Sequence, residues 1–130
     1  MKAEIYLIIV LAIFIKQSRS FDIPELNEDN FDKYLNGNNS LLVNFYSTYC
    51  GFCRAFAPEF EKAGEKGMQH NPIYVMAKVE INLQRKLAAN HNIRFVPTVI
   101  LYIKGEKKGE YNGPRLADNI ITFIESFNGA

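Results

Sequence analysis

Residues 49–53 read Tyr-Cys-Gly-Phe-Cys and hold both cysteines of the chain. The apolar run before them, residues 41–46, has the composition of a buried strand, and residues 54–67 carry a helical pattern. A Cys-x-x-Cys pair at such a junction places its first sulfur at a helix N-terminus, where free N–H groups and the helix dipole favour a thiolate. Cys50 is therefore the candidate nucleophile, and Cys53 is placed to resolve a mixed disulfide.

The sequence argues against other roles for the two cysteines. A Cys50–Cys53 bridge closes a very short loop, so it would add little to the stability of the fold. A structural zinc site usually needs four ligands, and only His70, His91 and carboxylates without matching spacing remain. The position between a strand and a helix also argues against a pair of inert, buried thiols. We therefore expect redox chemistry and no metal site.

These motifs resemble the thioredoxin superfamily, and in particular the catalytic domains of protein disulfide isomerases. The matching stretches are Val43-Asn44-Phe45-Tyr46, Cys50-Gly51-Phe52-Cys53 with residues 54–60 after it, Phe95-Val96-Pro97-Thr98, and residues 111–115. The resemblance implies a thioredoxin fold of the α/β class, with a central mixed β-sheet flanked by helices. It also implies a thiol–disulfide oxidoreductase, which needs no organic cofactor because the sulfurs themselves carry the electrons.

The composition fits one globular domain behind a targeting segment. The chain has 130 residues, of which 48% are hydrophobic, and a net charge of +1 that gives no sign of a nucleic-acid or anionic-membrane partner. Lys2, an apolar run at residues 5–15 and Ser-Arg-Ser at residues 18–20 form the pattern of a secretory signal. The run is about half of the roughly 20 residues that a membrane-spanning helix needs. We therefore expect a signal peptide at 1–20, cleaved after Ser20, and a thioredoxin domain at 21–130, in preference to an uncleaved anchor.

Hydrophobic periodicity and turn residues predict the order of elements after the leader. The first half holds a short strand at 21–26, a helix starting near 27, a central strand at 41–46, and a helix from about 50 that kinks near Pro58. A strand at 73–79 follows, then a short helix at 83–91 with Leu87 and Ala88 turned inward, and a strand at 98–103. The chain ends with a hairpin turn at 104–109, a last strand near 110–111, and a helix at 115–127 whose apolar stripe is Leu116, Ile120, Phe123, Ile124 and Phe127.

Two positions depart from the family that the chain resembles. Gly51 and Phe52 separate the cysteines and set the redox balance, and isomerases usually carry histidine where Phe52 stands. Without a neighbouring imidazolium to stabilise the Cys50 thiolate, we expect a less oxidising centre.

Asn44 occupies the strand position where relatives bury a carboxylate that exchanges a proton with the second cysteine. An amide cannot take up that proton, so we expect slower resolution by Cys53 and faster turnover in Asn44→Asp.

The resemblance also assigns residues to substrate binding and to tuning. In relatives the loop that contains Val96, Pro97 and Thr98 faces the active site through a cis X-Pro bond, and the Val96 backbone would pair with an extended substrate. The alternative is an ordinary proline at the start of a strand. Tyr49, where relatives usually have tryptophan, and Phe52 would offer an apolar surface to unfolded chains. Arg115 matches an arginine that lowers the pKa of the second cysteine in relatives; a plainly solvated arginine is the alternative.

The implied substrates are cysteine-containing proteins in the secretory pathway, either in the endoplasmic reticulum lumen or outside the cell. A thiol oxidase or glutathione would be the upstream redox partner. A rival hypothesis is a thioredoxin-like chaperone or escort that binds unfolded clients with little redox turnover, and a secreted effector with the same chemistry also stays open. The last four residues, Phe-Asn-Gly-Ala, do not form a Lys-Asp-Glu-Leu type retention signal, so both retention and secretion remain, as does a first domain of a longer product.

Overall fold

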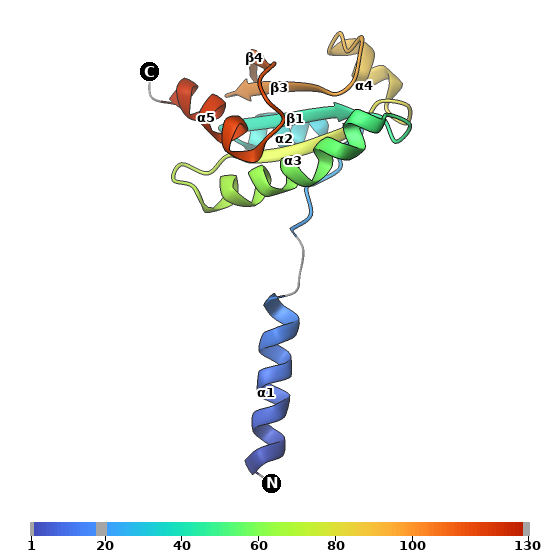
Figure 1. The fold of residues 1–130 in the computed structure, drawn as a ribbon. Coiled ribbons are helices and arrows are strands. Elements are labelled where there is room, and N and C mark those ends of the chain that lie inside the picture. The colour runs from blue at the N-terminus through green and yellow to red at the C-terminus, as the bar shows by residue number, and fades with distance from the viewer. Residues whose placement is uncertain (1, 18–20, 129–130) are drawn as a thin grey trace.

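The computed structural model describes residues 2–17 and 21–128, and Figure 1 shows their arrangement. The apolar leader forms helix α1 (Lys2–Gln17), whose side chains are exposed as far as Leu11. The expected cleavage site at residues 18–20 lies outside the described residues, so the secretory signal stays a prediction. Within the two described ranges, no helix combines the length and the apolar character that a bilayer crossing requires.

Four strands form one mixed sheet in the order β2-β1-β3-β4 (Figure 1). β1 (Ser40–Tyr46) pairs in parallel with β2 (Val75–Glu80) and antiparallel with β3 (Thr98–Ile103). β3 pairs antiparallel with β4 (Glu106–Tyr111), which lies at the edge. Every residue of β1 except the last is buried, as a continuous apolar strand in the middle of a covered sheet should be.

Helices cover both faces of this sheet (Figure 1). α3 (Gly51–Gln69) and α5 (Ala117–Asn128) pack on one face, and α2 (Phe31–Gly37) and α4 (Arg85–Asn90) lie on the other. The apolar side chains of the helices meet those of the strands in two buried clusters, one on each face of the sheet. The expected α/β architecture, a central mixed sheet flanked by helices, is confirmed.

The alternation of side chains along β1 decides what lies under the redox centre. Leu41, Val43 and Phe45 belong to the cluster under α2 and α4, whereas Leu42 belongs to the cluster under α3 and α5. Asn44 is two residues after Leu42, so it shares that face and borders a small cavity beneath α3. The strand therefore brings one polar side chain to the underside of the helix that carries the cysteines.

The segment before β1 differs from the sequence prediction in two places. The short strand expected at 21–26 is reduced to one β-bridge between Glu25 and Lys78, and the proline at 24 has no N–H to extend a ladder. The helix expected from residue 27 begins at 31, because the Asn27 carboxamide oxygen accepts hydrogen bonds from the amides of Asp29 and Asn30, both at 2.9 Å. These bonds hold a turn ahead of the helix.

The hairpin between β3 and β4 is tighter than predicted. Lys104 and Gly105 both have positive φ angles, 52° and 82°, and they alone form the turn. A two-residue turn of this kind matches the twist of the strands that it joins. The last strand consequently begins at Glu106, four residues before the expected start, and the charged run 106–110 is an exposed edge strand. Charges on an edge discourage pairing with other chains.

The other elements agree with the prediction apart from their ends. β3 has the predicted bounds, β2 begins at Val75, and α4 buries Leu87 and Ala88 as expected. Pro58 lies inside α3, while the kink expected there stays a prediction. α5 begins at Ala117, so Leu116 precedes the helix and is exposed instead of joining the buried stripe. Ile120 and Ile124 are fully buried, and Phe123 and Phe127 pack at the border of the core.

A histidine packs on the face of the sheet opposite to α3. The His91 ring lies 4.7 Å from the ring of Phe31 and 5.8 Å from that of Phe45, and the Tyr102 hydroxyl is 2.6 Å from its Nδ1 atom. Removal of the imidazole from water lowers the pKa of His91 below its ordinary value. The Tyr102 hydroxyl donates to Nδ1 in the neutral imidazole, which then carries its proton on Nε2.

We predict that stability falls on acidification because of His91. The unfolded chain binds a proton at this side chain near pH 6.5, whereas the folded chain resists it. The contribution of the neutral imidazole is therefore complete above about pH 6.5 and is lost as the pH drops below that value. Urea unfolding of the wild type and of His91→Gln, between about pH 8 and pH 5, should show a smaller loss of stability in the variant. Equal losses in the two proteins would contradict this role.

Candidate active site

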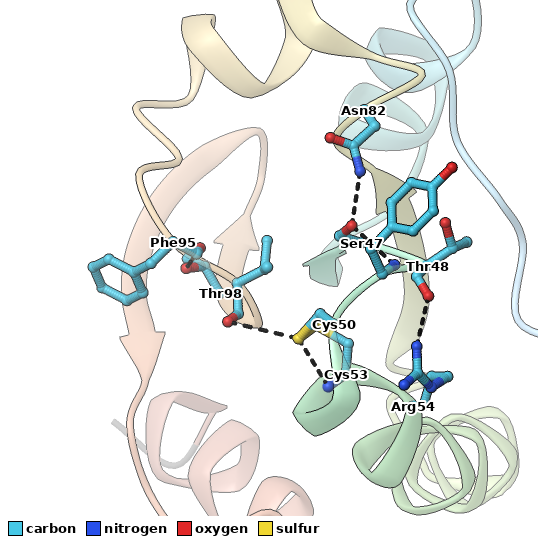
Figure 2. The surroundings of a disulfide bond; sticks show 10 residues. Ser47, Thr48, Cys50, Cys53, Arg54, Asn82, Phe95 and Thr98 are labelled. Atoms are coloured by element: carbon cyan, nitrogen blue, oxygen red, sulfur yellow. Dashed lines mark hydrogen bonds between the residues drawn. A yellow bond between two sulfur atoms is a disulfide. The ribbon is translucent and has the colours of Figure 1, made fainter.

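Cys50 ends the loop after β1 and is the N-cap residue of α3 (Figure 2). Its backbone is extended, with φ −99° and ψ 115°, and its sulfur accepts a hydrogen bond of 3.1 Å from the Cys53 amide. This is the interaction that a helix N-terminus offers to a serine or aspartate cap, made here to sulfur. The arrangement presents the Cys50 sulfur to the positive end of the helix dipole, as the sequence indicated.

The two cysteines form a disulfide and differ in accessibility. Their Cα atoms are 5.2 Å apart. Cys50 is partly exposed, whereas Cys53 is only 3% exposed and lies against the core of the domain. An incoming protein can reach the first sulfur and not the second. This is the asymmetry that an attacking and a resolving cysteine need.

The loop before Cys50 is fixed by residues that the sequence analysis did not single out. The side-chain amide of Asn82 donates to the Ser47 hydroxyl at 2.7 Å (Figure 2). The same hydroxyl accepts a hydrogen bond from the backbone N–H of Tyr49 at 3.2 Å. On the other side of the loop, the Arg54 guanidinium donates to the Thr48 carbonyl at 2.9 Å. Asn82 is 35 residues away from Ser47 in the chain, so no local pattern could have revealed this contact.

The loop before β3 faces the cysteines, as expected. The Val96–Pro97 peptide bond is cis, which confirms the prediction, and the Val96 carbonyl oxygen lies 3.9 Å from the Cys50 sulfur. The Thr98 hydroxyl donates to the Phe95 carbonyl at 2.6 Å and closes the loop on itself. The backbone of Val96 therefore borders the reactive sulfur. A second cis bond, before Pro72, was not anticipated.

Large apolar side chains surround the redox centre on the surface. Tyr49 is 86% exposed and Phe52 is 72% exposed, in keeping with the apolar surface expected there. Phe95, which the sequence analysis did not assign to binding, is 67% exposed in the facing loop. Beside it lies an open cleft of about 160 Å³ that runs from Val96 and the cis-proline to Arg115. These groups together make a surface suited to an extended, partly apolar chain.

Arg115 contacts one of the residues between the cysteines. Its guanidinium lies 5.5 Å from the centre of the Phe52 ring, in the geometry of a cation–π contact. Both side chains are exposed, so the contact is worth about 0.5–1 kcal/mol. Arg115 precedes α5 by two residues and does not start it, which corrects the expected position. The two residues expected to tune the centre are thus brought together.

Asn44 lies under the second cysteine. Its side chain is 4% exposed, and its carboxamide oxygen has no hydrogen-bond partner in the described part of the chain. With Cys53 it borders a cavity of about 50 Å³, which Lys78 and Glu61 also line. The amide that stands in place of the family's carboxylate therefore lies next to Cys53, whose proton that carboxylate would exchange.

Tyr46, which also lines this cavity, already makes a side-chain hydrogen bond. Tyr46 donates a hydrogen bond to Glu25, and the Lys78 ammonium lies 3.9 Å from the other carboxylate oxygen of Glu25. Burial, followed by the contact with Glu25, raises the pKa of Tyr46 above its ordinary value, so the phenol stays protonated at neutral pH. Tyr46 is consequently a donor here and not a base.

Comparison with known proteins agrees with this geometry. The family model for thioredoxin matches residues 22–126. The chain belongs to the thioredoxin family. Its Cys50–Cys53 pair and its cis-proline loop occupy the places that the family resemblance implied.

Several thioredoxin-family relatives carry the name protein disulfide isomerase. One from Hordeum vulgare is 37% identical over 103 residues, which cover 77% of this chain and 20% of that protein. Bloodstream-specific protein 2 of Trypanosoma brucei brucei is 33% identical over 119 residues, covering 92% of this chain and 23% of that protein. The chain spans only about a fifth of the length of these relatives.

Solved structures show the same likeness. The first thioredoxin domain of mouse protein disulfide-isomerase A4 matches with a TM-score of 0.72 and 29% identity, over 78% of this chain and 72% of that one. The zinc-bound form of human ERp44 matches with a TM-score of 0.76 and 29% identity, over 81% of this chain and 31% of that one. These matches support a protein disulfide isomerase-like domain.

We predict that the two reduced thiols react at very different rates. Cys50 is partly exposed at the N-terminus of α3, a position that favours a thiolate, whereas Cys53 is buried, so iodoacetamide should modify Cys50 at least about tenfold faster near neutral pH. Peptide mass spectrometry after timed quenching measures both rates in the same sample. Alkylation of the unfolded chain in urea serves as the control and should remove the difference. Equal rates in the folded protein would show that α3 does not activate Cys50.

Proposed function

We propose that this protein is a thiol–disulfide oxidoreductase that exchanges disulfides with cysteine-containing proteins. The observation that carries the proposal is the position of Cys50, which is partly exposed at the N-terminus of α3 and faces the Val96 carbonyl, with Cys53 bonded behind it. The relatedness to protein disulfide isomerases supports the same conclusion. No organic cofactor takes part, because the two sulfurs store and release the electrons.

In the reduced protein, the Cys50 thiolate attacks one sulfur of a substrate disulfide. A bond forms between Cys50 and that sulfur, and the other substrate sulfur leaves as a thiolate. Cys53 then loses its proton and attacks the Cys50 sulfur, so that the Cys50–Cys53 disulfide forms and the second substrate thiolate departs. The substrate gains two electrons and the cysteine pair loses two. The reverse sequence oxidises a dithiol substrate, and partial reversal rearranges a wrong disulfide.

The substrate chain would lie along the loop before β3. Pairing with the Val96 backbone places an extended segment beside Cys50, and Pro97 and Thr98 shape the loop. The exposed rings of Tyr49, Phe52 and Phe95 would contact apolar side chains of the substrate. Such contacts favour unfolded or partly folded proteins, which expose their apolar residues.

We place this activity in the secretory pathway, in the endoplasmic reticulum lumen or after secretion. The leader pattern of residues 1–20 and the relatedness to protein disulfide isomerases support this location. A thiol oxidase or glutathione would restore the redox state of the cysteine pair after each cycle. The reduction potential of the pair relative to its compartment sets the direction of the net reaction.

The proposed activity is tested with insulin reduction and with the reactivation of scrambled ribonuclease. The wild type should be active in at least one assay, and Cys50→Ser should lose the activity completely because no nucleophile remains. Cys53→Ser should instead accumulate a mixed disulfide through Cys50, visible by mass spectrometry. Activity that survives in Cys50→Ser, or its absence from the wild type, would refute the proposal.

A second function is favoured by two features of the same site. Phe52 and Asn44 replace groups that tune the redox chemistry in relatives, while the exposed rings suit the binding of unfolded clients. These features fit a thioredoxin-like chaperone or escort with little turnover. Suppression of aggregation by Cys50→Ser, together with no redox activity in the wild type, would favour this alternative.

We also predict that Phe52 makes the centre less oxidising than that of a typical isomerase. No imidazolium stabilises the Cys50 thiolate, so the wild-type potential should lie below about −180 mV, the value of protein disulfide isomerase. Phe52→His should raise the potential by about 30 mV, a tenfold change in the equilibrium with glutathione. Phe52→Leu is the matched control, since it removes the ring beside Arg115 without adding a charge. If the two variants had equal potentials, the missing imidazolium would not be the cause.

A further inference from the structure

The resolving step needs a base that the strand below does not supply. Cys53 is 3% exposed, so bulk water cannot take its proton directly, and Asn44 beneath it has no ionisable group. A buried thiol surrounded by apolar groups holds its proton more tightly than a free one. Some other group must accept the proton when Cys53 attacks the mixed disulfide.

Within the described residues, Glu61 is the one carboxylate that lines the cavity shared by Cys53 and Asn44. Glu25 also lies near Lys78, but it is occupied by the Tyr46 hydroxyl and the Lys78 ammonium. Glu61 makes no hydrogen bond or ion pair of its own with any residue the structure describes, and it is only partly exposed. Its carboxylate is therefore free to accept a proton.

Glu61 and Cys53 lie on the same face of α3, about two turns apart, and both line the cavity. Residues 53, 57 and 61 follow one another at intervals of four, so they form one stripe along the helix. Helical side chains lean toward the N-terminus, which directs the long Glu61 side chain back toward Cys53. Between them stands Ala57, whose small side chain also lines the cavity and leaves the path open.

The cavity can hold the water that such a path requires. Its volume of about 50 Å³ exceeds the roughly 10–15 Å³ that a single water molecule needs. The Asn44 carboxamide lacks a partner for its oxygen, and an amide can both accept a hydrogen bond from water and donate one to it. Asn44 can therefore hold a water molecule before and after that water passes on a proton.

We propose that Glu61 is the proton acceptor for Cys53, through water held by Asn44 in this cavity. The proposal rests on the proposed oxidoreductase function and names a group that the resolving step uses. The Cys53 thiol loses its proton to the water, which passes one to the Glu61 carboxylate. The resulting thiolate attacks the Cys50 sulfur, the substrate leaves as a thiolate, and the proton on Glu61 returns to that thiolate or to solvent.

The experiment separates the two sulfur reactions in time. The reduced full chain is mixed with dithiobis(nitrobenzoate), an aromatic disulfide that releases one coloured thiolate when Cys50 attacks and a second when Cys53 resolves. Stopped-flow absorbance records both phases. Glu61→Gln should slow the second phase at least about tenfold near neutral pH and leave the first unchanged. Glu65→Gln, one turn further along the exposed side of α3, is the matched control and should change neither phase.

The pH profile and a rescue variant distinguish proton transfer from a structural effect. If Glu61 accepts the proton, the wild-type second phase should be nearly flat from about pH 6 to pH 8, whereas in Glu61→Gln it should rise about tenfold per pH unit. Asn44→Asp in the Glu61→Gln background returns a carboxylate to the cavity and should restore the rate, which a misfolded variant could not do. Equal second phases in Glu61→Gln and Glu65→Gln would overturn the role of Glu61. Failure of the proposed function itself would instead appear as a wild type that reacts with dithiobis(nitrobenzoate) but neither reduces insulin nor reactivates scrambled ribonuclease.

Discussion

The redox site depends on one hydrogen bond, from the Cys53 amide to the Cys50 sulfur at the first turn of α3. This bond makes Cys50 the N-cap of a 19-residue helix, so its sulfur lies at the end of α3 where the free N–H groups of the first turn are found. A negative charge on the sulfur is stabilised by the same groups that begin the helix. The N-terminus of α3 therefore contributes both to local folding and to the reactivity of Cys50.

β1 supports the Cys50–Cys53 pair from the side of the sheet. As an inner strand it fixes the end of the loop that carries Cys50, and its alternation assigns residues to the two faces of the sheet. Asn44 is polar on a face that is otherwise apolar, and a buried amide with an unpartnered oxygen has an energetic cost of about 1–3 kcal/mol. A structural role would have been met better by an apolar residue. We attribute this cost to a role of Asn44 in binding water or in proton transfer.

The sequence predicted those features that depend on local pattern or on family resemblance. The cysteine motif, the buried strand before it and the bounds of β3 followed from patterns, and the cis bond at Pro97 followed from resemblance. The tight turn at Lys104 and Gly105 was missed because a charged run hides the start of an edge strand. The support of Ser47 by Asn82 was missed because it joins distant segments, whose contact only the fold creates.

The two departures from the isomerase pattern have a common consequence for electrostatics. Phe52 brings no charge to Cys50, yet its ring holds the Arg115 guanidinium at 5.5 Å, so a cation remains near the centre through an aromatic contact. Asn44 brings no base to Cys53, yet the cavity beside it is lined by Glu61. In both places a group from elsewhere in the domain stands next to the residue that lost the function. An exposed cation–π contact is weak and reversible, so the charge near Cys50 depends on what else contacts Phe52.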